Sequence, residues 1–252
     1  MNNANGGSVT YHIKGDDTDL NSKLDGVKSA LGKGAKLGGA MLGAVATGSV
    51  LVGKALTDTT KKAIDAYADI EQSIGGVETL FKENADEVIA NAQRAYKTAG
   101  VDANTYMQGV TSFSASLLQS LSGDTKKASE VADMAFQDMS DNANKFGTDM
   151  QSIQYAYQGF AKQNYTMLDN LKLGYGGTKE EMARLLDDAE KLSGVHYEIG
   201  NLNDMFQAIH VIQQELGVTG TTANESMSTI SGSVNSAKMA IRNLISGEGT
   251  VD

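Results

Sequence analysis

Histidines and carboxylates are the residues of this chain that could act as acids, bases or metal ligands. The three histidines are His12, His196 and His210, and none has a second histidine four residues later, as the zinc-binding HExxH helix requires. We expect His210, beside the apolar face of a predicted helix, to make one hydrogen bond. His196 falls in a short loop, where we expect a local role in a turn. The spacing therefore predicts no metal site.

Two carboxylate pairs, Glu180–Glu181 and Asp187–Asp188, lie on a predicted helix. Adjacent helical residues point about 100° apart, so neither pair shares a helix face, and solvated charges are the simplest interpretation. The chain has no cysteine, which excludes thiolate metal ligands and a cysteine nucleophile. We therefore expect no catalytic, cofactor-binding or metal-binding residue, and no enzymatic activity.

A glycine-rich run, GYGGTK at 174–179, has the composition of a phosphate-binding loop. It lacks the frame GxxxxGK[ST], and no strand pattern precedes it, both of which such a loop requires. The glycines more simply permit a tight entry into the helix that follows.

Charge is unevenly distributed along the 252 residues, whose net charge is −10. Residues 1–62 hold eight lysines and five aspartates, and the other 13 basic and 26 acidic side chains lie in residues 63–252. An acidic body disfavours binding to nucleic acid through a basic groove. We expect no specific nucleic-acid binding.

The pattern of apolar residues predicts an all-α chain. Proline, the usual helix breaker, is absent, and apolar residues recur at steps of three and four. We expect a multi-helix bundle with coiled-coil-like seams at 143–160 and 227–244. Gly75 and Gly76 should interrupt one helix, and Gly147 should divide another, after which Thr148 and Gln151 could form a capping box.

Two aspartates are also predicted to start helices. Asp102 and Asp124 can each cap the helix that follows it.

Four regions follow from composition: a polar leader and amphipathic helix (1–36), a Gly/Ala-rich apolar segment (37–56), a helical region (57–172) and a second helical region (173–252). The N-terminus has no secretory signal pattern. The uncharged run 37–53 allows three interpretations: a tightly packed soluble hairpin or oligomer contact, a segment that inserts into a membrane, or a flexible linker. It is shorter than the ~20 apolar residues of a typical bilayer span, but it has small-xxx-small spacings.

The last region contains three helical patterns with start and stop signals. Capping boxes are predicted at Thr178–Glu181 and at Thr222–Glu225, and Asn201 or Asn203 can cap the helix between them. Gly194 and Gly217 can end the first two helices. The residues expected to face inward on those two helices are Met182, Leu185, Leu186, Ala189 and Leu192, followed by Met205, Ile209, Ile212 and Leu216.

The same region carries a family resemblance. It contains the runs GYGGTKEEMARLL, NLNDMFQAIHVIQ, GVTGTTANESMSTISGS and AIRNLISG, in that order. Their order and spacing over residues 173–247 resemble the conserved globular region of phage tail tape measure proteins. A weaker likeness extends back to about Ala55.

The resemblance implies a template, or ruler, for tail tube assembly inside the tail lumen, which is released on infection to assist genome delivery across the host envelope. The length of an extended helix is fixed by its rise of ~1.5 Å per residue. The implied partners are further copies in a parallel homo-oligomer (often a trimer), the tail tube protein, tail assembly chaperones, tail tip or distal tail proteins, and the host inner membrane. The implied locations are the tail tube lumen of the virion, the host cytoplasm during assembly and the host inner membrane on ejection.

Members of the family usually continue for hundreds of residues beyond the last of these runs, so the resemblance fits either a tape measure protein or a fragment of one. A different class of function remains open. Residues 37–53, flanked by lysines, could serve a membrane-active, pore-forming helical protein. Liposome binding by the chain would favour that alternative.

Overall fold

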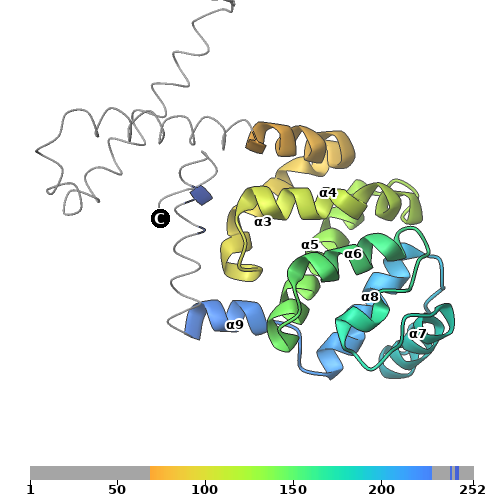
Figure 1. Ribbon diagram of the computed structural model, residues 1–252. Helices are drawn as coiled ribbons and strands as arrows, with labels where there is room; N and C mark the ends of the chain where they lie inside the picture. Colours follow the sequence, from red (N-terminus) through yellow and green to blue (C-terminus); the bar gives the residue numbers. More distant parts are fainter. Residues whose placement is uncertain (1–68, 229–238, 240–241, 244–252) are drawn as a thin grey trace, which may run out of the picture. The chain divides into compact units, whose positions relative to one another are not determined.

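The computed structural model describes residues 69–228, 239, 242 and 243 (Figure 1). All regular structure in these residues is helical, which confirms the predicted all-α class. The predictions for residues 1–68, including the apolar run 37–53, and most of the 227–244 seam lie outside the described residues. Within the described part of the chain, no helix has both the length and the apolarity needed to cross a bilayer.

The first described helix covers residues 69–81. The elements that follow are η1 (Lys82–Asn84), α3 (Ala85–Thr98), α4 (Ala103–Ser120), α5 (Thr125–Phe146), α6 (Met150–Phe160), η2 (Leu168–Leu171), α7 (Lys179–Ser193), α8 (Leu202–Glu215) and α9 (Thr221–Ser228).

Most helix starts follow from local sequence. Asp102, Asp124, Thr178 and Asn201 each accept a hydrogen bond from a backbone N–H in the first turn of α4, α5, α7 and α8, respectively. These side chains satisfy amides that have no partner within the helix. The predicted caps at these four positions are confirmed, with Asn201 rather than Asn203 capping α8.

The break at Gly147 is also confirmed, and it divides the 143–160 pattern between α5 and α6. Gly147 adopts the left-handed conformation, with a φ of 63°, at the end of α5. The predicted Thr148–Gln151 capping box is wrong, because Asp149 caps α6. Its carboxylate accepts hydrogen bonds from the backbone N–H and the hydroxyl of Ser152, at 3.0 and 3.2 Å.

The predicted interruption at Gly75 and Gly76 is wrong. The helix runs unbroken through both glycines and ends at Phe81, after which Lys82 takes a φ of 49°. Glycine keeps its backbone N–H, so it weakens a helix by only ~1 kcal/mol relative to alanine. The complete burial of Val77 and Phe81 offsets this cost.

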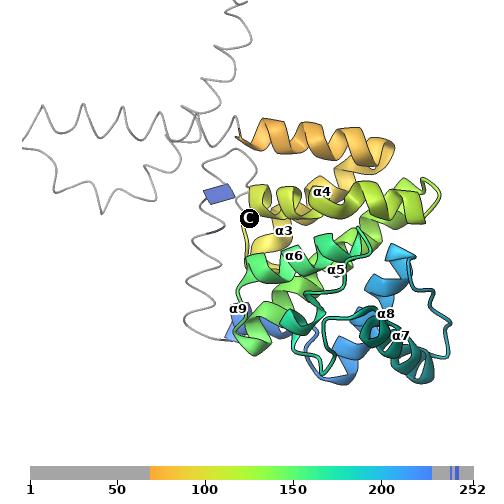
Figure 2. The ribbon, with the colours of Figure 1, turned by 45° about the vertical axis from the view of Figure 1, so that its right-hand side comes forward.

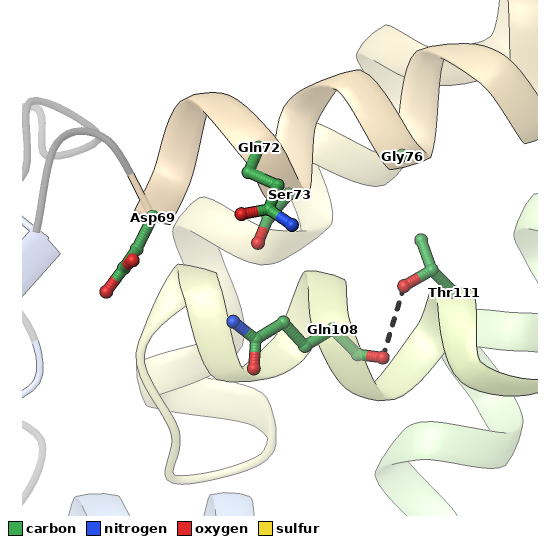
Figure 3. A pocket seen from close by; sticks show the side chains of 6 residues that line it. All are labelled: Asp69, Gln72, Ser73, Gly76, Gln108 and Thr111. Atoms are coloured by element: carbon green, nitrogen blue, oxygen red, sulfur yellow. Dashed lines mark hydrogen bonds between the residues drawn. The ribbon is translucent and has the colours of Figure 1, made fainter.

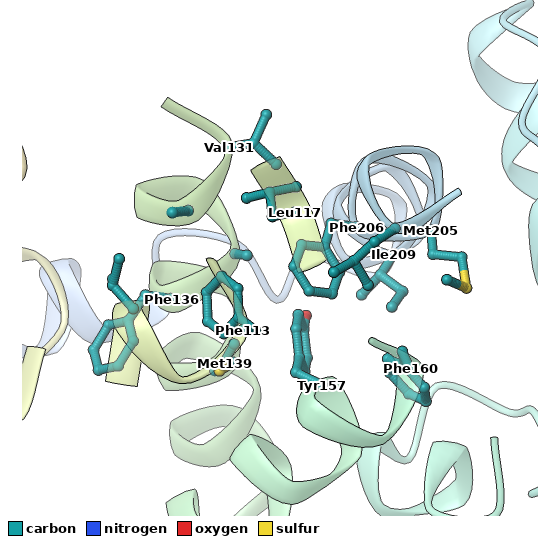
Figure 4. Close-up of a cluster of buried hydrophobic side chains, with 14 of the residues drawn as sticks. Phe113, Leu117, Val131, Phe136, Met139, Tyr157, Phe160, Met205, Phe206 and Ile209 are labelled. Atoms are coloured by element: carbon teal, nitrogen blue, oxygen red, sulfur yellow. The ribbon is translucent and has the colours of Figure 1, made fainter. Parts of the chain in front are cut away.

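Aromatic side chains from three helices meet in the core (Figure 4). Phe206 of α8 lies 5.3 Å, between ring centroids, from Phe113 of α4 and 5.0 Å from Tyr157 of α6. Edge-on and tilted ring contacts of this kind are favourable in addition to the apolar area they bury. The core thus joins helices that are far apart in the sequence.

Two leucines expected to face inward are exposed. Leu192 and Leu216 have relative exposures of 50% and 48%. Both lie at the C-terminal ends of their helices. They follow the three-four spacing of the apolar face, but no neighbouring helix extends far enough to cover them. The other seven inward residues predicted for α7 and α8 are buried.

Helices α7 and α8 pack against each other, and α8 also packs against α4 and α5. In both ribbon views they lie at the end of the bundle away from the helix 69–81 (Figures 1 and 2). Helix α5 contacts α3, α4, α6, α8 and α9, so it is surrounded on several sides. This central position explains why polar residues of α5 are buried.

Candidate functional site

The most unusual chemical feature of the described residues is a buried carboxylate paired with a histidine. Asp138 on α5 is almost completely buried, and His210 on α8 is about one-fifth exposed. Both carboxylate oxygens of Asp138 lie 2.9 Å from His210 Nδ1. The other ring nitrogen, Nε2, lies 2.8 Å from the side-chain amide nitrogen of Gln214. In the neutral ring, Nδ1 donates to Asp138 and Nε2 accepts from Gln214.

The electrostatics of this pair favour proton binding. Burial raises the pKa of Asp138 to about 6, although the hydrogen bond from His210 opposes this shift. The hydrogen bond to Asp138 raises the pKa of His210, and burial opposes that shift. The folded chain therefore holds protons at this pair more tightly than the unfolded chain does.

A partly buried carboxylate, Asp133 of α5, faces α4. Its Oδ1 accepts a hydrogen bond of 2.6 Å from the hydroxyl of Tyr106, and its Oδ2 accepts one of 2.7 Å from Gln137. Burial raises the pKa of Asp133 and, together with the nearby carboxylate, that of Tyr106. This pair fixes α4 against α5.

Asp141, one turn after Asp138, binds the start of α9. Its carboxylate accepts hydrogen bonds from the backbone N–H groups of Gly220 and Thr222, at 2.6 and 2.8 Å. The predicted Thr222–Glu225 capping box is therefore wrong. Thr222 lies inside α9, and its amide, like that of Gly220 just before the helix, is satisfied by the side chain of Asp141 on another helix.

The glycine-rich run before α7 is tied to its own helix. The backbone N–H of Gly176 donates to Glu181 Oε2 at 2.9 Å, and Arg184 bonds both Glu181 and the carbonyl oxygen of Gly174. Arg184 also lies over the ring of Tyr175, 4.3 Å from its centroid. In a phosphate-binding loop, such a backbone N–H group would donate to the phosphate. Here the Gly176 N–H already donates to the carboxylate of Glu181.

These contacts also correct two expectations. In the predicted capping box, Thr178 accepts from the N–H of Glu181 at 3.2 Å, but the Glu181 carboxylate bonds Gly176 rather than the N–H of Thr178. Glu181 is not simply a solvated charge, because Arg184 and Gly176 lower its pKa to about 2. Asp188 is also partnered, since it accepts from Tyr175 and from Lys191.

His196 makes a local contact. Its Nδ1 lies 2.8 Å from Glu190 Oε2, and both side chains are exposed. The hydrogen bond to Glu190 raises the pKa of His196. The pair connects the loop after α7 to that helix.

Two open hollows occur among the described residues. One, of about 240 Å³, lies between the helix 69–81 and α4 and is lined by polar side chains and Gly76 (Figure 3). The other, of about 400 Å³, lies between α9 and the bundle, where Ala99, Val101, Ala143 and Met150 form its apolar side. No group of three or more His, Asp and Glu side chains in the described residues is arranged to hold a metal ion.

Sequence reasoning missed Asp138 and Asp141 because both lie outside the three-four pattern that marks the apolar face of α5. The only available signal was their spacing of three residues, which places them on one side of the helix. What the arrangement can do chemically is hold a proton in the interior and fix the start of α9. Comparisons of the chain with models of known families, with curated proteins and with solved structures gave no match.

Proposed function

We propose that this chain is a phage tail tape measure protein, or part of one, in which the described helices form a folded body. The observation that carries this proposal is the set of four runs between residues 174 and 247, which resemble the conserved globular region of that family in both order and spacing.

The positions of these runs support the proposal. The first covers the glycine loop and the first half of α7, the second begins at the Asn201 cap of α8, and the third includes Gly217, Gly220 and α9. The residues of these four runs thus include some that start helices, some that end them and some that fill the core. Such residues are expected in a region that folds, in contrast to a uniform ruler helix.

In this proposal the body belongs to a longer helical assembly in the tail lumen. Parallel copies of the chain act there as a template for tail tube subunits, after assembly chaperones have shielded their apolar seams. Distal tail proteins bind one end of the assembly. On infection the chain leaves the tail ahead of the genome and reaches the host inner membrane.

The test combines partner binding with mass in solution. The full chain is coexpressed with the tail tube protein and tail assembly chaperones of the same phage, and its mass is measured by light scattering with and without residues 37–53. We expect copurification with the tail proteins and a discrete oligomer that survives the deletion. A monomer in both forms, with no tail protein bound, rejects the proposal.

A vesicle experiment tests the alternative class of function. The full chain and the 37–53 deletion are floated with vesicles of phosphatidylethanolamine and phosphatidylglycerol. Flotation that is lost on deletion, without any association with tail proteins, would replace the tape measure proposal with a membrane-active, pore-forming protein.

A further inference from the structure

Two side chains in the core carry polar atoms that make no hydrogen bond to the protein. Tyr157 of α6 and Gln213 of α8 are completely buried, each with 0% relative exposure. Among the described residues, the Tyr157 hydroxyl and both the oxygen and the nitrogen of the Gln213 amide are buried without a hydrogen-bond partner. Buried polar groups are nearly always bonded to protein or to ordered water, so these three atoms require an explanation.

The hydroxyl and the amide lie close to each other and to the Asp138 carboxylate. Burial, followed by the charge of Asp138, raises the pKa of Tyr157, and the nearby Gln213 amide opposes this shift. The Tyr157 ring packs against Phe206 of α8, with ring centroids 5.0 Å apart, and its hydroxyl points toward that helix (Figure 4). Polar groups from α5, α6 and α8 therefore meet at one place in an otherwise apolar core.

A direct bond between Tyr157 and Gln213 could not satisfy all three atoms. If the hydroxyl donates to the amide oxygen, the two N–H groups of the amide nitrogen still lack an acceptor. If the amide nitrogen donates to the hydroxyl oxygen, the hydroxyl proton and the amide oxygen still lack partners. A third group, able both to donate and to accept, is needed between them.

Water has the hydrogen-bonding capacity that this place requires. A buried water typically makes about three hydrogen bonds to groups that would otherwise have no partner. It can accept from the amide nitrogen or the hydroxyl and donate to the amide oxygen. Asp138 offers further acceptor capacity, because both of its oxygens share the single Nδ1 proton of His210. Since Asp138 is already paired with His210, a neutral molecule fits better than a cation.

We propose that α5, α6 and α8 enclose an internal hydration site, in which at least one ordered water bridges the Tyr157 hydroxyl and the Gln213 amide beside Asp138. The water completes the polar network of the Asp138–His210 pair and links α6 to it. The site belongs to the folded body itself and does not depend on the larger assembly to which the chain contributes.

A crystal structure of the full wild-type chain, at a resolution that shows ordered water, tests the site directly. We expect density for a water within hydrogen-bonding distance of the Tyr157 hydroxyl oxygen and of at least one atom of the Gln213 amide. A direct contact between the two side chains with no water beside them, or a Gln213 side chain turned to the surface, would overturn the proposal.

Magnetic relaxation dispersion of the solvent water, which counts long-lived internal waters, tests the site in solution. The double variant Tyr157→Phe/Gln213→Met removes all three polar atoms and keeps the side-chain lengths similar. It should lose at least one long-lived water relative to the wild type.

The matched control is Tyr197→Phe. It removes the hydroxyl of another buried tyrosine, which already donates to Ser193 at 3.1 Å, and it should keep the wild-type number of waters. An unchanged number in the double variant, or an equal loss in both variants, would overturn the proposal. If the double variant does not fold, the wild-type crystal structure decides.

Discussion

Gly109, in the middle of α4, should not tolerate alanine. A Cβ atom added there would overlap the ring of Phe136 on α5, with Cε2 and Cδ2 as the closest atoms. Phe136 is completely buried and packs edge-on against Tyr106, with ring centroids 5.0 Å apart. The ring therefore has no free direction in which to move, and the missing methyl group is what lets α4 and α5 approach closely.

The magnitude follows from two opposing terms. Alanine in a helix interior is favoured over glycine by ~1 kcal/mol. Forcing an extra methyl group into a packed core typically costs 1–3 kcal/mol, and this overlap lies toward the upper end of that range. Gly109→Ala should therefore lower the free energy of unfolding by about 1–2 kcal/mol, measured by urea denaturation and followed by circular dichroism.

Gly75→Ala is the matched control, because an added Cβ there meets no atom within 4 Å and the residue lies inside the helix 69–81. It should raise the free energy of unfolding by about 0.5–1 kcal/mol. Combining Gly109→Ala with Phe136→Leu should remove most of the cost of the alanine, so the double-mutant cycle should be non-additive. A stabilising Gly109→Ala, or strict additivity with Phe136→Leu, would refute the packing argument.

Other predictions concern protons, caps and the glycine loop. The raised pKa values of Asp138 and His210 contribute stability below the pKa values of the unfolded chain, and this contribution is lost as the pH rises through the folded values, about 6 for Asp138. The urea concentration at the unfolding midpoint should therefore decrease as the pH rises from about 5 to 8. Asp138→Asn should make this decrease smaller; an unchanged pH dependence in the variant would contradict this account. Asp149→Ala should cost about 1 kcal/mol in thermal melts, whereas Thr148→Ala should cost little because it removes no cap; the reverse order would show that the cap is misassigned. Gly177→Ala should destabilise the chain by about 1–3 kcal/mol, because the added Cβ would overlap the backbone carbonyl oxygen of Thr166; unchanged thermal stability would show that the chain around Thr166 can move aside.

Much of the candidate site could not be predicted from the sequence. The caps at Asp102, Asp124 and Asn201 could be predicted because each interaction spans three residues or fewer. The Asp138–His210 pair spans 72 residues, and the side-chain type alone suggested solvent exposure for Asp138. Local sequence contains no information about which helices surround α5.

The sequence by itself determined the helical class, most helix ends and the inward positions of α7 and α8. These features depend on backbone geometry and on the period of one helix, which act over a few residues. The three-dimensional packing decided where such rules fail. It covered the polar side of α5, held α9 by a carboxylate from another helix, and left Leu192 and Leu216 in solvent. Each of these outcomes depends on which helices lie side by side, and that is set by the packing of the whole core.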